Sequence, residues 1–349
     1  MQHHRMFLAG IIGMGALLLS GCDDRRPLSK LEGFAQGTTY AISVELPPSV
    51  KLETVNQAVK AEFARIDQEF SNYRDDSAIE RFNAKQTTEP QTVSEELVSM
   101  IETARTISQK SQGCYDLTVK PLFDLWGFKA NTFTPPSDDQ IQSTLANVGM
   151  DKLETLNGST LRKQRPDLRV DLSSIAQGHT SVRLAQILEE FGVKNYLIEV
   201  GGELQLKGLK PDGTPWRVAI EKPLPNQQSL HKIASFDSGM PLALVTSGTY
   251  RHYFDEQGTR YSHIIDARTG KPIQHNTVSV VVIHPDSAVA DAWATALLCV
   301  GSEQGLRLAN ENLISALFID EAEGSLVERQ SRSLQGSAMV RLIDPEGTL

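Results

Sequence analysis

The sequence predicts an α+β protein with a mixed, largely antiparallel sheet core flanked by helices, because helical and strand patterns mix without a repeating βαβ period. Over residues 52–70 apolar side chains recur at steps of three and four, which indicates an amphipathic helix. From 215 to 284 strand patterns dominate instead. No Pro/Gly-rich linker divides the chain, so we expect one domain over 33–345, with two lobes that meet at a ligand cleft.

The individual elements rest on periodicity and on start and stop signals. Ser137 and Gln140 form the pattern of a capping box, and Asn157-Gly158 is typical of a hairpin turn. In chain order we expect a strand at 38–46, helices at 52–70, from Ser94 to before Gly113 and from Ser137, a hairpin around Asn157-Gly158, a helix at 179–191, strands at 195–200, 215–221, 242–246, 259–265 and 277–284, helices at 290–298 and 303–311, and strands at 313–319 and 337–342.

Composition and missing motifs exclude several classes of function. The chain has 349 residues, 40% of them hydrophobic, which is enough for a large core. Its net charge of −9, with both signs interspersed, argues against a nucleic-acid partner. A Gly-x-Gly-x-x-Gly turn, a P-loop, a Gly-x-Ser-x-Gly elbow and a His-x-x-x-His spacing are all missing from the sequence, which disfavours Rossmann, P-loop, serine-hydrolase and zinc sites.

The N-terminus has the features of an export signal. Arg5 precedes an apolar run from Met6 to Leu19 that is short for a membrane span. The "LSGC" at 19–22 resembles a bacterial lipobox, so we expect a lipoprotein signal peptide at 1–21, acylation of Cys22 and a polar tether at 22–32. Asp23 resembles the signal that retains lipoproteins at the inner membrane of Gram-negative bacteria, which places the protein on the periplasmic side. The alternative is an ordinary signal peptide with a chance cysteine.

Two further cysteines remain, Cys114 in a "GCYD" turn and Cys299 in an apolar helical run. They could pair in an oxidising compartment, but sequence alone does not bring them together. We expect two unpaired thiols and no metal site built on them.

The segment "ADAWATALL" at 290–298 carries Asp291 and Thr295 one helical turn apart, so that a carboxylate and a hydroxyl share one face. Hard oxygens of this kind suit Mg²⁺ or Ca²⁺, and Mg²⁺ often completes its coordination with phosphate oxygens. The alternative is structural: Thr295 would bond back to a helix carbonyl, and Asp291 would interact with the positive end of the helix dipole.

Seven segments, which occur in a characteristic order along the chain, strengthen the interpretation of Asp291 and Thr295 as metal ligands. The segments "SNYRDDSAIERFN", "GCYDLTVKPLFDLWGF", "DLSSIAQGH", "YLIEVGGEL", "VTSGTYRHYF", "YSHIIDARTGKPI" and "ADAWATALL" resemble the ApbE family of FAD:protein FMN transferases. The resemblance covers about 33–345 and implies an ApbE-like, T-fold-related fold.

The resemblance also implies the site. Mg²⁺ would be bound by Asp291, which is also a catalytic residue, by Thr295 and by the backbone carbonyl of Ala176. Independently, His263 is our candidate for the catalytic base, because the unperturbed pKa of histidine lies close to working pH; the alternative is a structural polar residue in a strand. Tyr73 could stack on a ring system, and Asp116 could accept hydrogen bonds from adenine or ribose. The implied FAD contacts are Gln36, Tyr73, Cys114, Tyr115, Asp116, Ser173, His179 and Ile264.

Four positions depart from the family's common residues. Gln36 replaces a methionine, His179 a tyrosine, Gln177 a lysine or glutamate, and Ala294 an aspartate that close relatives often carry. The departures bear on affinity more than on the type of reaction.

The implied activity is Mg²⁺-dependent transfer of the FMN moiety of FAD through a phosphoester bond to a Thr or Ser of a target protein, with release of AMP. The acceptors suggested by the resemblance are subunits of membrane redox complexes. Two alternatives stay open: hydrolysis of FAD to FMN and AMP, and a flavin-binding lipoprotein without chemistry.

Overall fold

The computed structural model describes residues 27–128, 132–224, 229–250, 253–256 and 259–345. The expected signal peptide at 1–21 and the acylation site Cys22 lie outside these ranges. None of the helices within them combines the length and the apolar character that crossing a bilayer requires.

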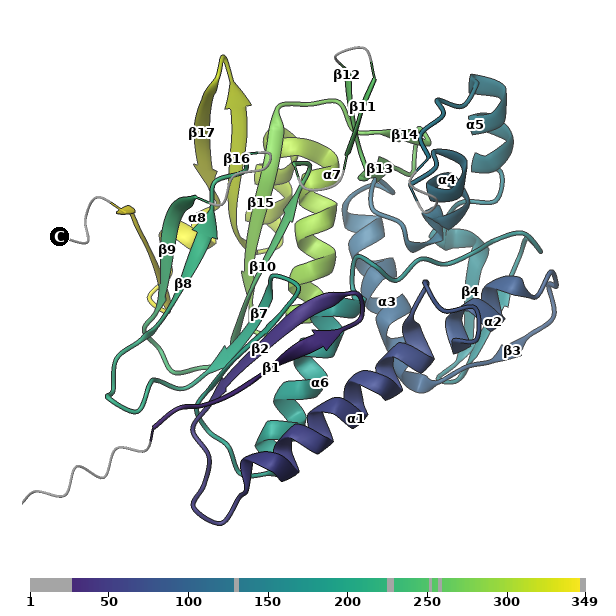
Figure 1. The fold of residues 1–349 in the computed structure, drawn as a ribbon. Coiled ribbons are helices and arrows are strands. Elements are labelled where there is room, and N and C mark those ends of the chain that lie inside the picture. The colour runs from purple at the N-terminus through teal and green to yellow at the C-terminus, as the bar shows by residue number, and fades with distance from the viewer. Residues whose placement is uncertain (1–26, 129–131, 225–228, 251–252, 257–258, 346–349) are drawn as a thin grey trace, which may run out of the picture.

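An eight-stranded sheet forms the centre of the fold (Figure 1). The interior strand β15 (Thr277–His284) has an apolar run at 280–283, and seven of its eight residues are buried. Such burial on both faces requires cover on both sides of the sheet. In spatial order the strands are β1 (Ser29–Ala35), β2 (Thr38–Val44), β6 (Tyr196–Val200), β7 (Glu203–Lys207), β10 (Leu242–Gly248), β15, β16 (Ser315–Ala322) and β17 (Ser325–Gln330).

Alternate residues of β15 enter two different cores. Val280 and Val282 pack with the helical layer, and Val281 and Ile283 pack with a second sheet on the opposite face. That sheet has the order β18 (Val340–Ile343), β9 (Leu230–Phe236), β8 (Trp216–Glu221). The result is a sheet, sheet and helix layering that follows from the two-residue period of a strand.

Helices cover the other face of the main sheet. The longest is α7 (Ser287–Glu311), which packs on β10 and β15 and against α6 (Ala176–Glu190) and α3 (Glu95–Lys110). The remaining helices are α1 (Leu52–Phe70), α2 (Ala78–Ala84), η1 (Leu117–Val119), α4 (Lys120–Leu125), α5 (Asp138–Leu145), η2 (Met150–Lys152) and α8 (Arg332–Gln335).

Three smaller sheets complete the described structure. The hairpin β4 (Leu153–Asn157) and β5 (Thr160–Lys163) pairs with β3 (Gln91–Thr92) beside α2 and α3 (Figure 1). Two-stranded sheets join β11 (Tyr253–Glu256) to β12 (Thr259–Ser262) and β13 (Ile265–Asp266) to β14 (Lys271–Pro272).

A kink divides α7. Gly301 has φ 76° and ψ 169°, outside the helical region. Two side chains bond the backbone groups that the kink releases: the Nε2 of His275 donates to the Leu298 carbonyl at 2.9 Å, and the Ser302 amide donates to Thr277 Oγ1 at 2.8 Å. The helix is therefore bent at a defined place by glycine and by two polar side chains, one from the start of β15 and one from the bend before it.

The fold differs from the sequence-based expectation in several respects, including elements that were not expected, such as α2, β7, β9 and β17. Every strand pair in the described ranges is antiparallel, where a mixed but largely antiparallel sheet was expected. The first strand begins at Ser29, so part of the expected tether pairs with β2. The expected strand at 259–265 is interrupted at 263–264, where Ser262 Oγ accepts from the Ile264 amide at 3.0 Å. The helices expected at 290–298 and 303–311 are the two parts of α7.

Candidate active site

A cavity of about 320 Å³ lies between α7 and β10 on one side and the segment from Cys114 to Phe128 on the other. A volume of this order suits part of a nucleotide-sized ligand. Among the residues implied by the resemblance, it is lined by Tyr73, Cys114, Tyr115, Asp116, Ser173, His263, Ile264, Asp291 and Thr295.

Asp291 and Thr295 both face this cavity from α7, as their spacing predicts. Asp291 is 4% exposed, and its Oδ2 accepts from the Gly178 amide in the first turn of α6 at 3.1 Å. Thr295 Oγ1 lies 3.2 Å from Ser247 Oγ on β10. The carboxylate thus binds a free backbone donor at the positive end of a neighbouring helix, and the hydroxyl is close to a second hydroxyl.

The Asp291 carboxylate has no lysine or arginine ion-pair partner among the described residues. Burial raises its pKa from 3.8 to about 7, although the hydrogen bond from Gly178 acts in the opposite direction. Asp116, Asp171 and Glu203 line the same cavity. An anionic ligand would therefore need a cation beside it, and a carboxylate, hydroxyls and backbone carbonyls are oxygen donors that suit Mg²⁺.

A second cavity of about 470 Å³ adjoins the first. The two share the side chains of Asn72, Tyr73, Ser173 and Gln177. Tyr73 is 79% exposed, so its ring is available for stacking at the junction. The two cavities together provide a two-part cleft for a ligand longer than either.

Gln36 and Ala176 line the second cavity. The hydroxyl of Thr180 lies 3.1 Å from Gln36 Oε1 and 2.8 Å from the Ala176 carbonyl oxygen. The polar residue at 36 therefore has a polar neighbour on α6. The role of the Ala176 carbonyl as a metal ligand stays a prediction.

Tyr115 and Asp116 are buried in the wall of the first cavity. Both carboxylate oxygens of Asp116 accept backbone hydrogen bonds, Oδ1 from the Thr118 amide at 2.7 Å and Oδ2 from the Met150 amide at 2.8 Å. Burial nevertheless raises the pKa values of the Asp116 carboxyl and the Tyr115 hydroxyl. Asp116 thus caps η1 and ties it to η2, and a bond to adenine or ribose stays a prediction.

His179 lies outside the linings of both cavities. Its Nε2 is 2.6 Å from Glu96 Oε1, and its ring packs edge-on against Phe70, with centroids 5.6 Å apart. Ala294 is fully buried in the main core and also lies outside both cavity linings. The alanine at this position therefore removes no oxygen from the described cavity wall.

The two cysteines form a disulfide, which corrects the expectation of unpaired thiols. The Sγ atoms of Cys114 and Cys299 are 2.00 Å apart across 185 residues of sequence. An Asp266 carboxylate oxygen lies within 4.8 Å of both sulfurs, but bonded sulfurs are not thiolate ligands, so this cluster is not a metal site. The pairing is a product of tertiary folding, because α7 packs beside the end of α3.

Sequence reasoning missed a buried polar network beside the cavity. The side-chain amide of Asn72 donates to the Val170 carbonyl at 2.9 Å, and its oxygen accepts from the Leu172 amide at 2.6 Å. The same amide reaches Glu80, which forms an ion pair with Lys120 at 3.1 Å. Asn72 lies within the quoted segment "SNYRDDSAIERFN", which was the available signal. The network holds the backbone at 170–172, a few residues before α6 begins.

The helix-backed antiparallel sheet and the acidic two-part cleft define an α+β protein with room for an elongated ligand and with oxygen donors from two helices. The chain belongs to the ApbE family, whose model matches residues 36–318.

The relatives share this length and fold. The chain is 38% identical over 322 residues to an FAD:protein FMN transferase of Vibrio cholerae, covering 91% of this chain and 95% of the relative. To the corresponding protein of Escherichia coli K12 it is 35% identical over 317 residues, covering 87% and 90%.

Solved structures agree. The flavin transferase ApbE from Vibrio cholerae matches with a TM-score of 0.81 at 38% identity, covering 88% of this chain and 98% of that one. The apo flavinyl transferase ApbE from Pseudomonas stutzeri matches with a TM-score of 0.81 at 33% identity, covering 88% and 96%. The resemblance stated from the sequence and the ApbE-like fold are confirmed.

Proposed function

We propose that this chain transfers the FMN moiety of FAD to a protein. The observation that carries the proposal is the two-part cleft with Asp291 and Thr295 on its wall, in a chain similar over nearly its full length to FAD:protein FMN transferases. The bond between the two phosphates of FAD breaks, AMP leaves, and a phosphoester forms between the FMN phosphoryl group and a Thr or Ser hydroxyl of the acceptor.

The donor set fits Mg²⁺. Asp291, Thr295 and the Ala176 carbonyl would hold the ion, which would offset the negative charge of the pyrophosphate as it is split. The fit is supported by the burial of Asp291 without a cationic partner among the described residues and by the other carboxylates of the cavity.

The protein residues would bind and orient the two ends of FAD. Tyr73, at the junction of the cavities, would stack on a ring system. His263 lines the first cavity and is our candidate for the base that takes the proton of the acceptor hydroxyl. We expect the acceptors to be subunits of membrane redox complexes.

The test is to incubate the chain with FAD, Mg²⁺ and a candidate acceptor subunit, and to measure flavin fluorescence of the acceptor after denaturing electrophoresis. A covalently fluorescent acceptor that is lost with EDTA would support the proposal. Release of FMN and AMP without labelling would mean hydrolysis, and unchanged FAD under all conditions would mean a binding protein. The last two outcomes would each overturn the transfer reaction.

We also propose that the protein is acylated at Cys22 and held on the periplasmic side of the inner membrane. A buried disulfide supports an oxidising compartment. Labelling of the wild type with a radioactive fatty acid, and loss of the label in Cys22→Ser, would support this location. Equal labelling of both proteins, or no label in either, would contradict it.

A further inference from the structure

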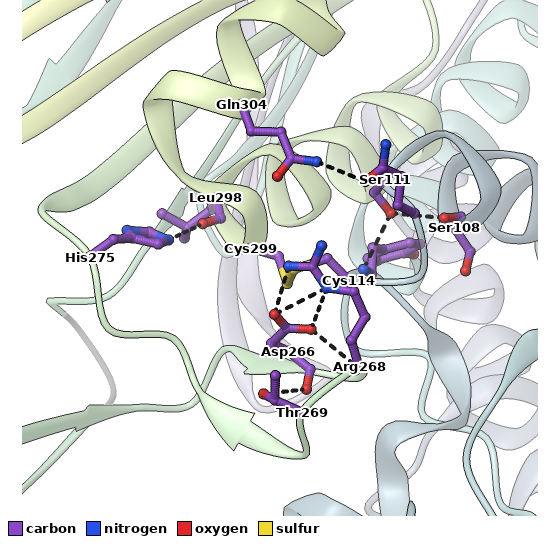
Figure 2. Close-up of a disulfide and its surroundings, with 12 residues drawn as sticks. Ser108, Ser111, Cys114, Asp266, Arg268, Thr269, His275, Leu298, Cys299 and Gln304 are labelled. Carbon is purple, nitrogen blue, oxygen red and sulfur yellow. Dashed lines mark hydrogen bonds and ion pairs between the residues drawn. A yellow bond between two sulfur atoms is a disulfide. The ribbon is translucent and has the colours of Figure 1, made fainter.

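The Cys114–Cys299 disulfide lies in the wall of the cavity. Both cysteines line it, and they are 0% and 3% exposed. Figure 2 shows the bond and the side chains around it. A cross-link whose only purpose is to stabilise the fold has no need to lie in the wall of the ligand site. Its position raises the question of what the bond holds there.

On one side the bond holds the helix that carries the proposed metal ligands. Asp291, Thr295 and Cys299 follow one another at steps of four along α7, and all three line the cavity. Residues at this spacing share one helical face. The disulfide therefore leaves α7 one turn beyond Thr295, on the face that Thr295 and Asp291 present to the ligand.

On the other side the bond holds a junction of two loops. The Cys114 carbonyl accepts from the Ala267 amide at 3.2 Å, which ties it to the segment that contains His263 and Ile264. Asp266 of that segment lies beside the sulfurs and pairs with Arg268 at 2.7 Å (Figure 2). Tyr115 and Asp116, which follow Cys114 directly, are themselves wall residues.

We propose that the Cys114–Cys299 disulfide is a positioning link for FMN transfer. It fixes the α7 face that carries Asp291 and Thr295 relative to the opposite wall formed by residues 114–116 and 263–267. Reduction by a dithiol, which supplies two electrons and two protons and is itself oxidised to a disulfide, leaves two thiols and releases the walls from each other. The inference rests on the proposed function and deepens it.

The first experiment asks whether the bond exists in the protein. The full chain, purified in detergent, is alkylated without reductant, digested and analysed by mass spectrometry. A linked peptide pair containing Cys114 and Cys299 is expected. Recovery of both residues as alkylated free thiols would overturn the proposal.

The second experiment compares Cys114→Ser/Cys299→Ser with Val59→Ala, a buried site between α1 and α6 outside both cavity linings. Both variants lose stability, and both are assayed at a temperature where circular dichroism shows them folded. We expect the cysteine variant to raise the KM for FAD and the Mg²⁺ concentration for half-maximal rate by about tenfold or more, since a displacement of about 1 Å in a site has effects up to about 100-fold. Val59→Ala should leave both unchanged.

An unchanged KM for FAD and an unchanged Mg²⁺ requirement in the cysteine variant would show that the bond only stabilises the fold, and would overturn the proposal. If that variant does not fold, wild type treated with dithiothreitol replaces it, with near-ultraviolet circular dichroism as the check of folding. Reoxidation should then restore the wild-type constants.

Failure of the proposed function is distinguished by a binding measurement. If oxidised wild type labels no acceptor, transfer is wrong, but fluorescence titration with FAD at fixed Mg²⁺ still measures the effect of the bond on the cleft. A reduced affinity for FAD without the disulfide supports the link in that case, and an unchanged affinity overturns it.

Discussion

Asp291 is almost fully buried and has no ion-pair partner in the described part of the chain. Within the described ranges, the Gly178 amide is the one donor from which its carboxylate accepts a hydrogen bond. A buried carboxylate in this state either keeps its proton or binds a cation. The residue is therefore costly for the unliganded fold and useful for a metal-dependent reaction.

Replacing Asp291 with Asn should reduce Mg²⁺-dependent labelling of the acceptor by about 100-fold or more, because the amide keeps a bond from Gly178 but is a weak ligand for a hard cation. The unliganded protein should be at least as stable as wild type by thermal unfolding. Asp138→Asn, at a side chain that is 81% exposed, is the matched control and should change neither. Full activity in Asp291→Asn would contradict the proposed metal site.

Glu96 gives a pH dependence of stability. Burial alone would raise its pKa, but hydrogen bonds from His179 and Arg65 outweigh burial and lower the pKa from 4.5 to about 2. Between these values the unfolded chain binds more protons, so the contribution of Glu96 is complete above pH 4.5 and is lost as the pH falls towards 2.

Wild type should therefore have a higher unfolding free energy than Glu96→Gln by about 1–2 kcal/mol near neutrality, and this difference should shrink below pH 4.5. The figure is reduced for solvent screening, because the Glu96 side chain is 23% exposed. Denaturant unfolding from pH 2.5 to 7 measures it. Glu303→Gln, whose side chain is 93% exposed, should show no such trend. A difference that is constant over this range would refute the assignment.

At the scale of the element, α7 and the start of α6 depend on two glycines. Gly301 allows the kink because its φ of 76° is unfavourable for other residues. Gly178 allows the close approach of the helices, since a Cβ there would lie 2.3 Å from the Ser287 carbonyl oxygen.

Gly301→Ala should destabilise the protein by about 1–3 kcal/mol, because it combines an unfavourable φ with a Cβ only 3.1 Å from His275 Cδ2. Gly324→Ala is the matched control: its φ is 77°, but nothing lies within 4 Å of the added Cβ. The difference between the two variants in denaturant unfolding measures what the ψ of 169° and the contact with His275 add at Gly301. Equal losses would mean that neither adds a measurable cost.

Gly178→Ala should reduce both stability and Mg²⁺-dependent activity, because the methyl group meets backbone and must separate α6 from α7 at the point where the Gly178 amide binds Asp291. We expect a loss of about 2 kcal/mol or more in unfolding free energy. Gly158→Ala, in a turn where a Cβ meets nothing within 4 Å, should be close to wild type. A stable and fully active Gly178→Ala would contradict this account of the crossing.

At the scale of the whole molecule, the disulfide connects segments far apart in sequence. Removing it frees a loop of 185 residues in the unfolded chain, for which the chain-entropy relation gives up to about 5 kcal/mol of lost stability. Denaturant unfolding of oxidised wild type and of Cys114→Ala/Cys299→Ala measures the loss. A loss below about 1 kcal/mol would mean that the unfolded chain gains little freedom without the link.

Local patterns predicted much of the fold. The apolar period identified α1 with its observed bounds, the branched apolar run identified β15, and the Ser137 capping box and the Asn157-Gly158 hairpin formed as expected. These features depend on interactions within a few residues or on the burial of one face, so they are readable in sequence. Asp291 and Thr295 were found for the same reason: their common face is a property of one helix.

The sequence by itself determined the α+β class, most of the elements, the family and the pair of oxygen donors on α7. Only the tertiary structure decided that Cys114 bonds to Cys299, that Asn72 and Glu80 support the cavity, and that His179 pairs with Glu96 outside the cavity lining. Each of these contacts joins segments whose proximity depends on how the layers pack. A periodicity shows which side of an element is buried, but not which distant element it is buried against.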